Sequence, residues 1–136
     1  MKLDKLLHVK CTKKSFYRSW VEFFSPYHKL TAREKDVFAR ILEQYCILRD
    51  EVKDQSVLLE VLWSNRSKKD MRESLGVSQA YFQLVMAKLR KNGVLIDDDD
   101  IEPRYVPNKT ADPRFILYVL FDYSSPDDPI RGEKQD

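Results

Sequence analysis

The pattern of apolar and polar positions predicts a mainly helical chain, with a few short strands towards its end. The first predicted helix covers residues 15–24, where aromatic residues fall at near-helical spacing: Phe16, Trp20, Phe23 and Phe24. Pro26 should end this helix, because proline disfavours helical geometry in the residue before it. Residues 1–30 therefore form a predicted N-terminal helical arm.

A second helix is predicted over residues 32–50, and its start is marked most clearly. Thr31 and Glu34 have the spacing of a capping box, in which each side chain binds the other residue's backbone amide. One face of this helix is apolar and consists of Val37, Phe38, Ile41, Leu42, Tyr45 and Leu48. Residues 51–55 are predicted as a linker, and residues 56–63 are ambiguous between a helix and a strand.

The next stretch has the pattern of a helix-turn-helix motif. Ser67 is a candidate N-cap for a short helix that ends near Ser74, and Gly76 supplies a permissive backbone for the turn. Ser78 should cap a second helix that continues to about Asn92. The buried stripe of that helix is predicted to comprise Phe82, Val85, Met86 and Leu89.

Short strands are predicted after this motif. Residues 94–96 should form the first, Asp97–Asp100 a solvated hairpin tip, and residues 101–106 a return strand that Pro103 interrupts. Residues 115–121 are apolar and rich in strand-forming residues, which predicts a buried strand. The expected fold class is mainly α with a small β wing (α+β), comprising one domain over residues 31–122 and a flexible polar tail over residues 123–136.

These residues together resemble the winged helix-turn-helix superfamily. The resemblance covers about residues 30–122, with the wing formed by the strands after Gly93. A narrower stretch, residues 63–107, looks like small winged-helix proteins encoded by crAss-like tailed phages. The wider resemblance implies a fold but no single function, because winged helices bind DNA, RNA and proteins. The narrower one implies a phage protein, with a place in the virion near the portal and tail.

Composition narrows the range of functions. The chain has 136 residues, three glycines and two cysteines, which leaves no room for glycine-rich phosphate loops or a multi-disulfide framework. It also lacks an apolar run long enough to span a membrane, so a soluble protein in a reducing compartment is expected. His8 and His28 are far apart, and Asp97–Asp100 lacks the glycine and distal glutamate of a calcium loop. We therefore expect no enzyme activity, no metal and no cofactor.

Charge is divided unevenly along the chain, although the total is only +2. Residues 1–30 carry seven basic and two acidic residues, and residues 66–91 have the same counts. Residues 92–136 carry five basic and eleven acidic residues, so the chain is +8 up to residue 91 and −6 after it. The basic surface of the helix-turn-helix consists of Arg66, Lys68, Lys69, Arg72, Lys88, Arg90 and Lys91.

This basic surface favours DNA binding, whereas two other features favour a protein partner. The outward face of the second helix would present Gln79, Ala80, Tyr81, Gln83, Leu84 and Ala87. Gln79 and Gln83 can read adenine, but the first two turns hold no Arg or Lys, and Tyr81, Leu84 and Ala87 form an apolar strip. The predicted wing is acidic and would repel phosphates through Asp97, Asp98, Asp99, Asp100 and Glu102.

The N-terminal arm leaves three alternatives open. Phe16, Tyr17 and Trp20 lie among Lys10, Lys13, Lys14 and Arg18, a mixture that can stack single-stranded bases. The aromatic side chains can instead pack on the core while the basic residues face water. In the third alternative, the arm docks onto a neighbouring subunit.

The sequence as a whole favours a structural subunit over a regulator. The leading hypothesis is a non-enzymatic interaction protein of a tailed-phage virion, assembled in the host cytoplasm, in a head–tail connector ring. Its partners would be copies of itself and other virion proteins, with no membrane. The alternative is a cytoplasmic, sequence-specific regulator that binds duplex DNA. Opposite charge on the two parts of the chain favours assembly, because such parts attract each other head-to-tail.

Overall fold

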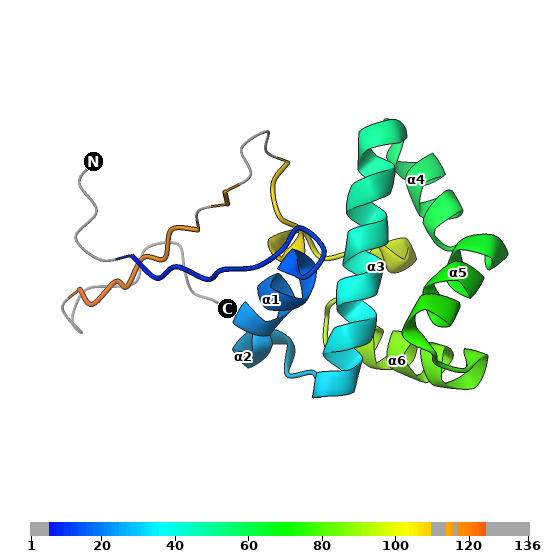
Figure 1. Cartoon of the computed structure of the whole chain (residues 1–136), viewed down its shortest axis with the longest axis horizontal. Helices are drawn as coiled ribbons and strands as arrows, with labels where there is room; N and C mark the ends of the chain where they lie inside the picture. Colours follow the sequence, from blue (N-terminus) through cyan, green and yellow to red (C-terminus); the bar gives the residue numbers. More distant parts are fainter. Residues whose placement is uncertain (1–5, 110–113, 116, 125–136) are drawn as a thin grey trace.

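The structure is a computed structural model that describes residues 6–109, 114–115 and 117–124. Within this part the regular elements are α-helices and two short 3₁₀ turns (Figure 1). In chain order they are α1 (Phe16–Phe23), α2 (Ser25–His28), α3 (Ala32–Glu51), α4 (Gln55–Leu62), α5 (Asn65–Leu75), α6 (Gln79–Lys91), η1 (Asp97–Asp99) and η2 (Pro103–Tyr105). Most of the predicted polar tail, residues 125–136, lies outside the described residues.

Capping residues set the helix boundaries largely as predicted. Thr31 accepts a hydrogen bond from the amide of Glu34, and the Glu34 carboxylate accepts one from the amide of Thr31, which confirms the capping box. Ser78 likewise accepts from the amide of Tyr81 at the start of α6. Gly76 ends α5 with a φ of +68°, a left-handed conformation that glycine adopts at little cost.

The region between α3 and α6 settles one open prediction and corrects another. Residues 56–62, left open between a helix and a strand, belong to the helix α4, which Asp54 caps through the amides of Ser56 and Val57. The predicted N-cap of α5 is wrong, because Ser64 caps the helix by accepting from the Ser67 amide at 3.2 Å. The Ser67 side chain is buried within the first turn instead.

One apolar core joins the helices around α3. The largest fully buried side chains are Phe38, Phe82, Ile41, Leu42, Leu58, Leu62, Met71, Leu89 and Ile101. Figure 1 shows α3 upright at the centre, with α1 and α2 on one side and α4 and α5 mainly on the other. Trp20 on α1 donates its indole N–H to the carbonyl of Tyr105 at 2.8 Å, so α1 belongs to the same packed body.

The β wing is absent from the described part of the chain, so the α+β winged-helix prediction is wrong. In its place, Leu95 and Ile101 form an isolated antiparallel bridge. Between them Asp97–Asp99 form a 3₁₀ turn, and Pro103 begins η2 directly after the bridge. The ladder cannot extend there, because proline has no N–H to donate and its φ suits a helical turn. The described fold is therefore all helical.

The predicted buried strand at residues 115–121 is also wrong. Phe115 packs against Phe16 and Trp20, with ring centroids 5.9 and 5.0 Å apart. Residues 117–124, which we call the extended segment, have no regular secondary structure (Figure 1). All of them are exposed. A buried strand needs neighbouring strands, and within the described residues the wing that should have supplied them is one bridge.

Among the described residues, no helix combines the length and apolar character that crossing a membrane requires.

Candidate interaction surfaces

The outward face of α6 is exposed and partly apolar. Leu84 is 67% exposed, and Ala80 and Ala87 lie on the same side of the helix. Lys88 and Lys91 continue this side towards the C-terminal end. We call these five residues the α6 face. It is an apolar stripe that ends in positive charge, a composition suited to a partner with an apolar stretch followed by an acid.

The other predicted α6 positions lie at the edges of this face. Gln79 and Gln83 are exposed, in agreement with the prediction. Tyr81 is half-buried, and the guanidinium of Arg33 lies 5.2 Å from the centroid of its ring. Arg33, which the sequence analysis did not single out, thus covers part of the predicted apolar strip.

The residues of the predicted basic surface differ in whether they form ion pairs. Arg90 donates twice to the Asp99 carboxylate, at 2.7 and 3.0 Å, and this contact raises the pKa of the guanidinium. Arg66 lies 3.7 Å from Asp70 one helical turn away. For Lys68, Lys69, Lys88 and Lys91 the described residues provide no ion pair. Arg72 is half-buried near the end of α5.

The acidic residues predicted for the wing form a turn that hydrogen bonds hold against the helical body. Trp63 donates its indole N–H to the Asp99 carbonyl at 3.0 Å, and Gln55 donates to the Asp100 carboxylate at 3.2 Å. Asp97 and Asp98 remain exposed. Glu102 pairs with Arg104 at 3.4 Å instead of joining the turn. Trp63 and Gln55 were missed by the sequence analysis, because they lie 36 and 45 residues from their partners.

The aromatic residues of the predicted N-terminal arm are used inside the body. Trp20 is buried, and Phe16 and Tyr17 are half-buried against the core. Burial raises the pKa of Tyr17 to about 12, and the neighbouring Cys46 adds to this shift. This arrangement supports the interpretation that these three aromatic side chains pack on the core, and it makes them poorly accessible for stacking on bases.

The basic side chain next to these rings is also engaged. Arg18 donates to Asp36 at 2.7 Å and to Glu22 at 2.9 Å, and Lys35 donates to Glu22 at 2.9 Å. Hydrogen bonds from Arg18 and Lys35 lower the pKa of the Glu22 carboxyl to about 2. This ion-pair cluster fastens α1 to α3, so Arg18 serves the fold.

Among the described residues, the extended segment contains the longest run of consecutive exposed apolar residues. Leu120 is 87% exposed and Phe121 83% exposed, and Leu117, Tyr118 and Val119 are exposed beside them. Its first residues border a shallow hollow of about 250 Å³ that is also lined by Phe23, Phe24, Tyr27 and Arg104. At the other end of the chain, Leu6, Leu7 and Val9 are exposed in an irregular stretch on the same side of the body (Figure 1).

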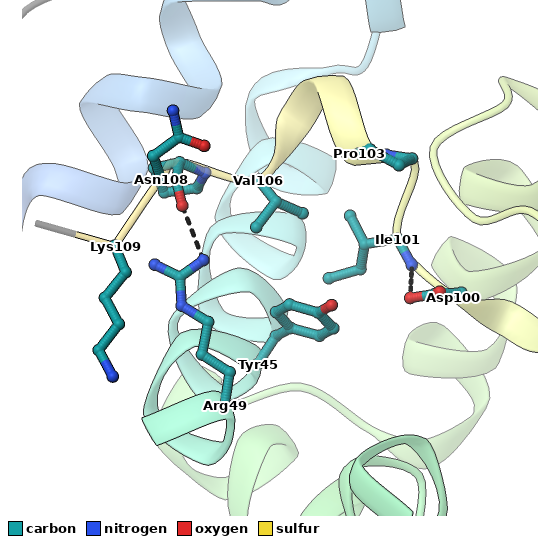
Figure 2. A pocket seen from close by; sticks show the side chains of 9 residues that line it. Tyr45, Arg49, Asp100, Ile101, Pro103, Val106, Asn108 and Lys109 are labelled. Atoms are coloured by element: carbon teal, nitrogen blue, oxygen red, sulfur yellow. Dashed lines mark hydrogen bonds between the residues drawn. The ribbon is translucent and has the colours of Figure 1, made fainter. Parts of the chain in front are cut away.

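A second shallow pocket, of about 280 Å³, lies where the chain leaves the helical body (Figure 2). Its floor holds Tyr45 and Arg49 of α3, opposite Ile101 and Val106. The Arg49 guanidinium donates to the carbonyl of Pro107 at 2.7 Å, and Lys109 lies 3.1 Å from Asp50. These contacts fix the backbone from which the chain continues towards the extended segment, which explains the polar lining without a ligand.

The residues suited to chemistry are scattered. Cys11 is exposed and Cys46 is buried, and both are free thiols. His28 is fully buried and bound by backbone groups. Across the described ranges, no three His, Cys, Asp or Glu side chains are grouped so that they can hold a metal ion.

Comparison of the chain with protein-family models, with curated proteins and with solved structures found no match. The relationship to tailed-phage proteins therefore stays a prediction from the sequence.

Proposed function

We propose that the chain is a non-enzymatic assembly subunit that binds copies of itself and other proteins of a tailed-phage virion, in a head–tail connector ring. The virion and the ring follow from the resemblance of residues 63–107 to proteins of crAss-like tailed phages. Assembly as such is supported by the surfaces described above.

The observation that carries this proposal is the exposure of the extended segment. Apolar surface in water costs roughly 25 cal/mol per Å², and soluble monomers rarely leave large contiguous apolar patches uncovered. Leu117, Tyr118, Val119, Leu120 and Phe121 follow one another and are all exposed. When a partner covers these side chains, their removal from water stabilises the complex, which favours a protein–protein contact.

Sedimentation velocity of the full chain over a range of concentrations tests assembly. We expect the mass to rise with concentration, and the double variant Leu120→Ser/Phe121→Ser to stay monomeric. Val57→Ser is the matched control, since Val57 is also apolar and 42% exposed but lies on α4. Mass spectrometry of purified phage particles tests the location. A chain that is monomeric at every concentration and absent from particles would contradict the proposal.

DNA binding is the second candidate, and one observation favours it. Lys68 and Lys69 of α5 and Lys88 and Lys91 of α6 have no ion pair within the described residues. Free lysines on neighbouring helices can contact phosphates. This candidate predicts binding to duplex DNA at about 50 mM salt that weakens steeply as salt rises.

Fluorescence anisotropy with labelled duplex DNA measures this binding. The variant Lys68→Gln/Lys69→Gln/Lys88→Gln should bind more weakly, whereas Lys53→Gln, an exposed lysine beyond the end of α3, should not. Failure of the unmodified chain to bind at about 50 mM salt removes this candidate, because low salt strengthens phosphate contacts.

A further inference from the structure

We propose that the extended segment of one copy docks on the α6 face of a second copy, so that the chain assembles head-to-tail. This inference rests on the proposed function and names the two surfaces that meet.

The two surfaces have matching patterns. The extended segment presents apolar residues as far as Phe121, and Asp122 follows them. The α6 face presents Ala80, Leu84 and Ala87 and ends in Lys88 and Lys91. When the apolar residues of the segment pack on the apolar residues of the α6 face, the exposed side chains of Leu84 and Leu120 are removed from water. In the same contact, the Asp122 carboxylate lies next to the two lysines.

Asp122 is prepared to stay ionised in this contact. The amide and the hydroxyl of Ser124 donate to its carboxylate, and these hydrogen bonds lower the pKa of Asp122. Lys88 and Lys91 have no ion pair within the described residues, so neither has to give up a partner when the contact forms. The wider charge distribution acts in the same direction, because residues 92–136 carry −6 and residues 66–91 carry +5.

Position explains why the partner is a second copy. The extended segment runs away from the body on the side of α1 and α2, whereas α5 and α6 lie mainly on the other side of α3 (Figure 1). A contact between different surfaces of two copies is heterologous, so each copy uses its segment once and its α6 face once. Heterologous contacts produce a ring when the rotation closes and a filament when it does not.

Mixing two variants that each lack one surface tests this arrangement. The segment variant is Leu120→Ser/Phe121→Ser, and the face variant is Leu84→Lys. Alone, each should associate at least roughly tenfold more weakly than the unmodified chain, because the burial of at least one large apolar side chain in the contact is lost. Mixed in equal amounts, they should form a 1:1 heterodimer in native mass spectrometry and nothing larger, because one intact segment and one intact face remain.

Several outcomes overturn the docking model. If Leu84→Lys assembles like the unmodified chain, the α6 face is not the acceptor. If the variants do not form a heterodimer although the unmodified chain assembles, segments pair with each other. Val57→Lys, an exposed position on α4, is the control and should assemble normally. An unmodified chain that never assembles contradicts the proposed function itself, so the two failures are distinguishable.

A charge exchange provides a second measurement that keeps the apolar residues in place. Lys88→Glu/Lys91→Glu should weaken self-association, and adding Asp122→Lys to the same chain should restore it, because every contact then joins the reversed pair. Both substitutions lie on exposed or half-exposed side chains, so folding should be unaffected. Absence of restoration, with the thermal stability of both variants unchanged, would contradict the predicted contact between Asp122 and the lysines.

Discussion

The helical body and the extended segment use the same kinds of residue with opposite results. In the body, Phe38 and Leu42 are completely buried between α3 and its neighbours. In the extended segment, Leu120 and Phe121 have apolar side chains of the same size but lie almost fully in water. The difference teaches that apolar character alone does not bury a side chain. A side chain is buried only where other side chains surround it, and within the described residues Leu120 and Phe121 lie outside the packed core.

A matched pair of phenylalanine substitutions should separate the two regions most strongly. Phe38→Ala leaves a cavity in the core and should lower the free energy of unfolding by about 3–5 kcal/mol. Phe121→Ala should change it by less than about 0.5 kcal/mol, because the ring is 83% exposed. Denaturant unfolding at a concentration below assembly measures both. Similar losses in the two variants would show that the segment is part of the folded body.

The buried His28 gives the stability of the body a pH dependence just below pH 6.5. Nε2 donates to the Val21 carbonyl at 2.8 Å and Nδ1 accepts from the Leu30 amide at 3.1 Å, which requires a neutral ring. Burial lowers the pKa of His28 below its ordinary value of 6.5. The unfolded chain then binds a proton that the folded chain does not, so stability is complete above pH 6.5 and falls as pH drops below it.

For a single proton this loss is at most about 1.4 kcal/mol per pH unit. Thermal unfolding between pH 7.5 and pH 5.5 measures it, and His28→Gln should flatten the slope although it lowers stability overall. His8, exposed in the chain before α1, supplies the control, since His8→Gln should leave the slope unchanged. A slope that persists without His28 would assign the pH dependence to other groups.

The turn before α6 should respond more weakly. Gly76 has a φ of +68°, and a Cβ built there meets no atom within 4 Å. Gly76→Ala therefore adds backbone strain without a clash and should cost about 1–2 kcal/mol. Gly76→Asn should cost less, because asparagine tolerates the left-handed region. Equal losses in both variants, measured by thermal unfolding, would point to a cause other than φ.

The comparison also shows how far the sequence could predict this fold. Local signals were reliable at Thr31 and Ser78, where each cap depends on residues three positions apart, but at the start of α5 the cap is Ser64 and not the predicted Ser67. Long-range contacts were not predictable, and the wing failed for this reason. The strand-forming residues at 94–96 and 115–121 can form strands only if neighbouring strands pair with them. The 3₁₀ turn at Asp97 and Pro103 prevent residues 97–105 from forming such a strand.

For the candidate surfaces too, local features could be predicted from the sequence and long-range contacts could not. Exposure of Leu84 and Gln83 on α6 follows from helical periodicity, so the prediction was confirmed there. The ion pair between Arg90 and Asp99 joins α6 to the turn η1. The sequence singled out both residues but did not predict that they pair. The exposure of the extended segment could not be predicted, because its apolar sequence is equally typical of a buried strand.

The contact between Arg90 and Asp99 should produce the smallest effect, and it shows how the body neutralises its own charge. The Arg90 side chain is 46% exposed and that of Asp99 32% exposed, so water screens the pair and removal should cost about 0.5–1 kcal/mol. Lys91 is the matched control on the same helical turn. It has no ion pair within the described residues, and Lys91→Gln should be nearly neutral.

Arg90→Gln and Asp99→Asn should lose similar amounts, and the double variant should lose little more than either, because both remove the same interaction. At about 1 M salt the difference between Arg90→Gln and Lys91→Gln should shrink, since screening then acts within about 3 Å. Additive losses would show that the two groups act independently. Arg90 would then join Lys88 and Lys91 as positive charge free to meet the acidic end of a neighbouring segment.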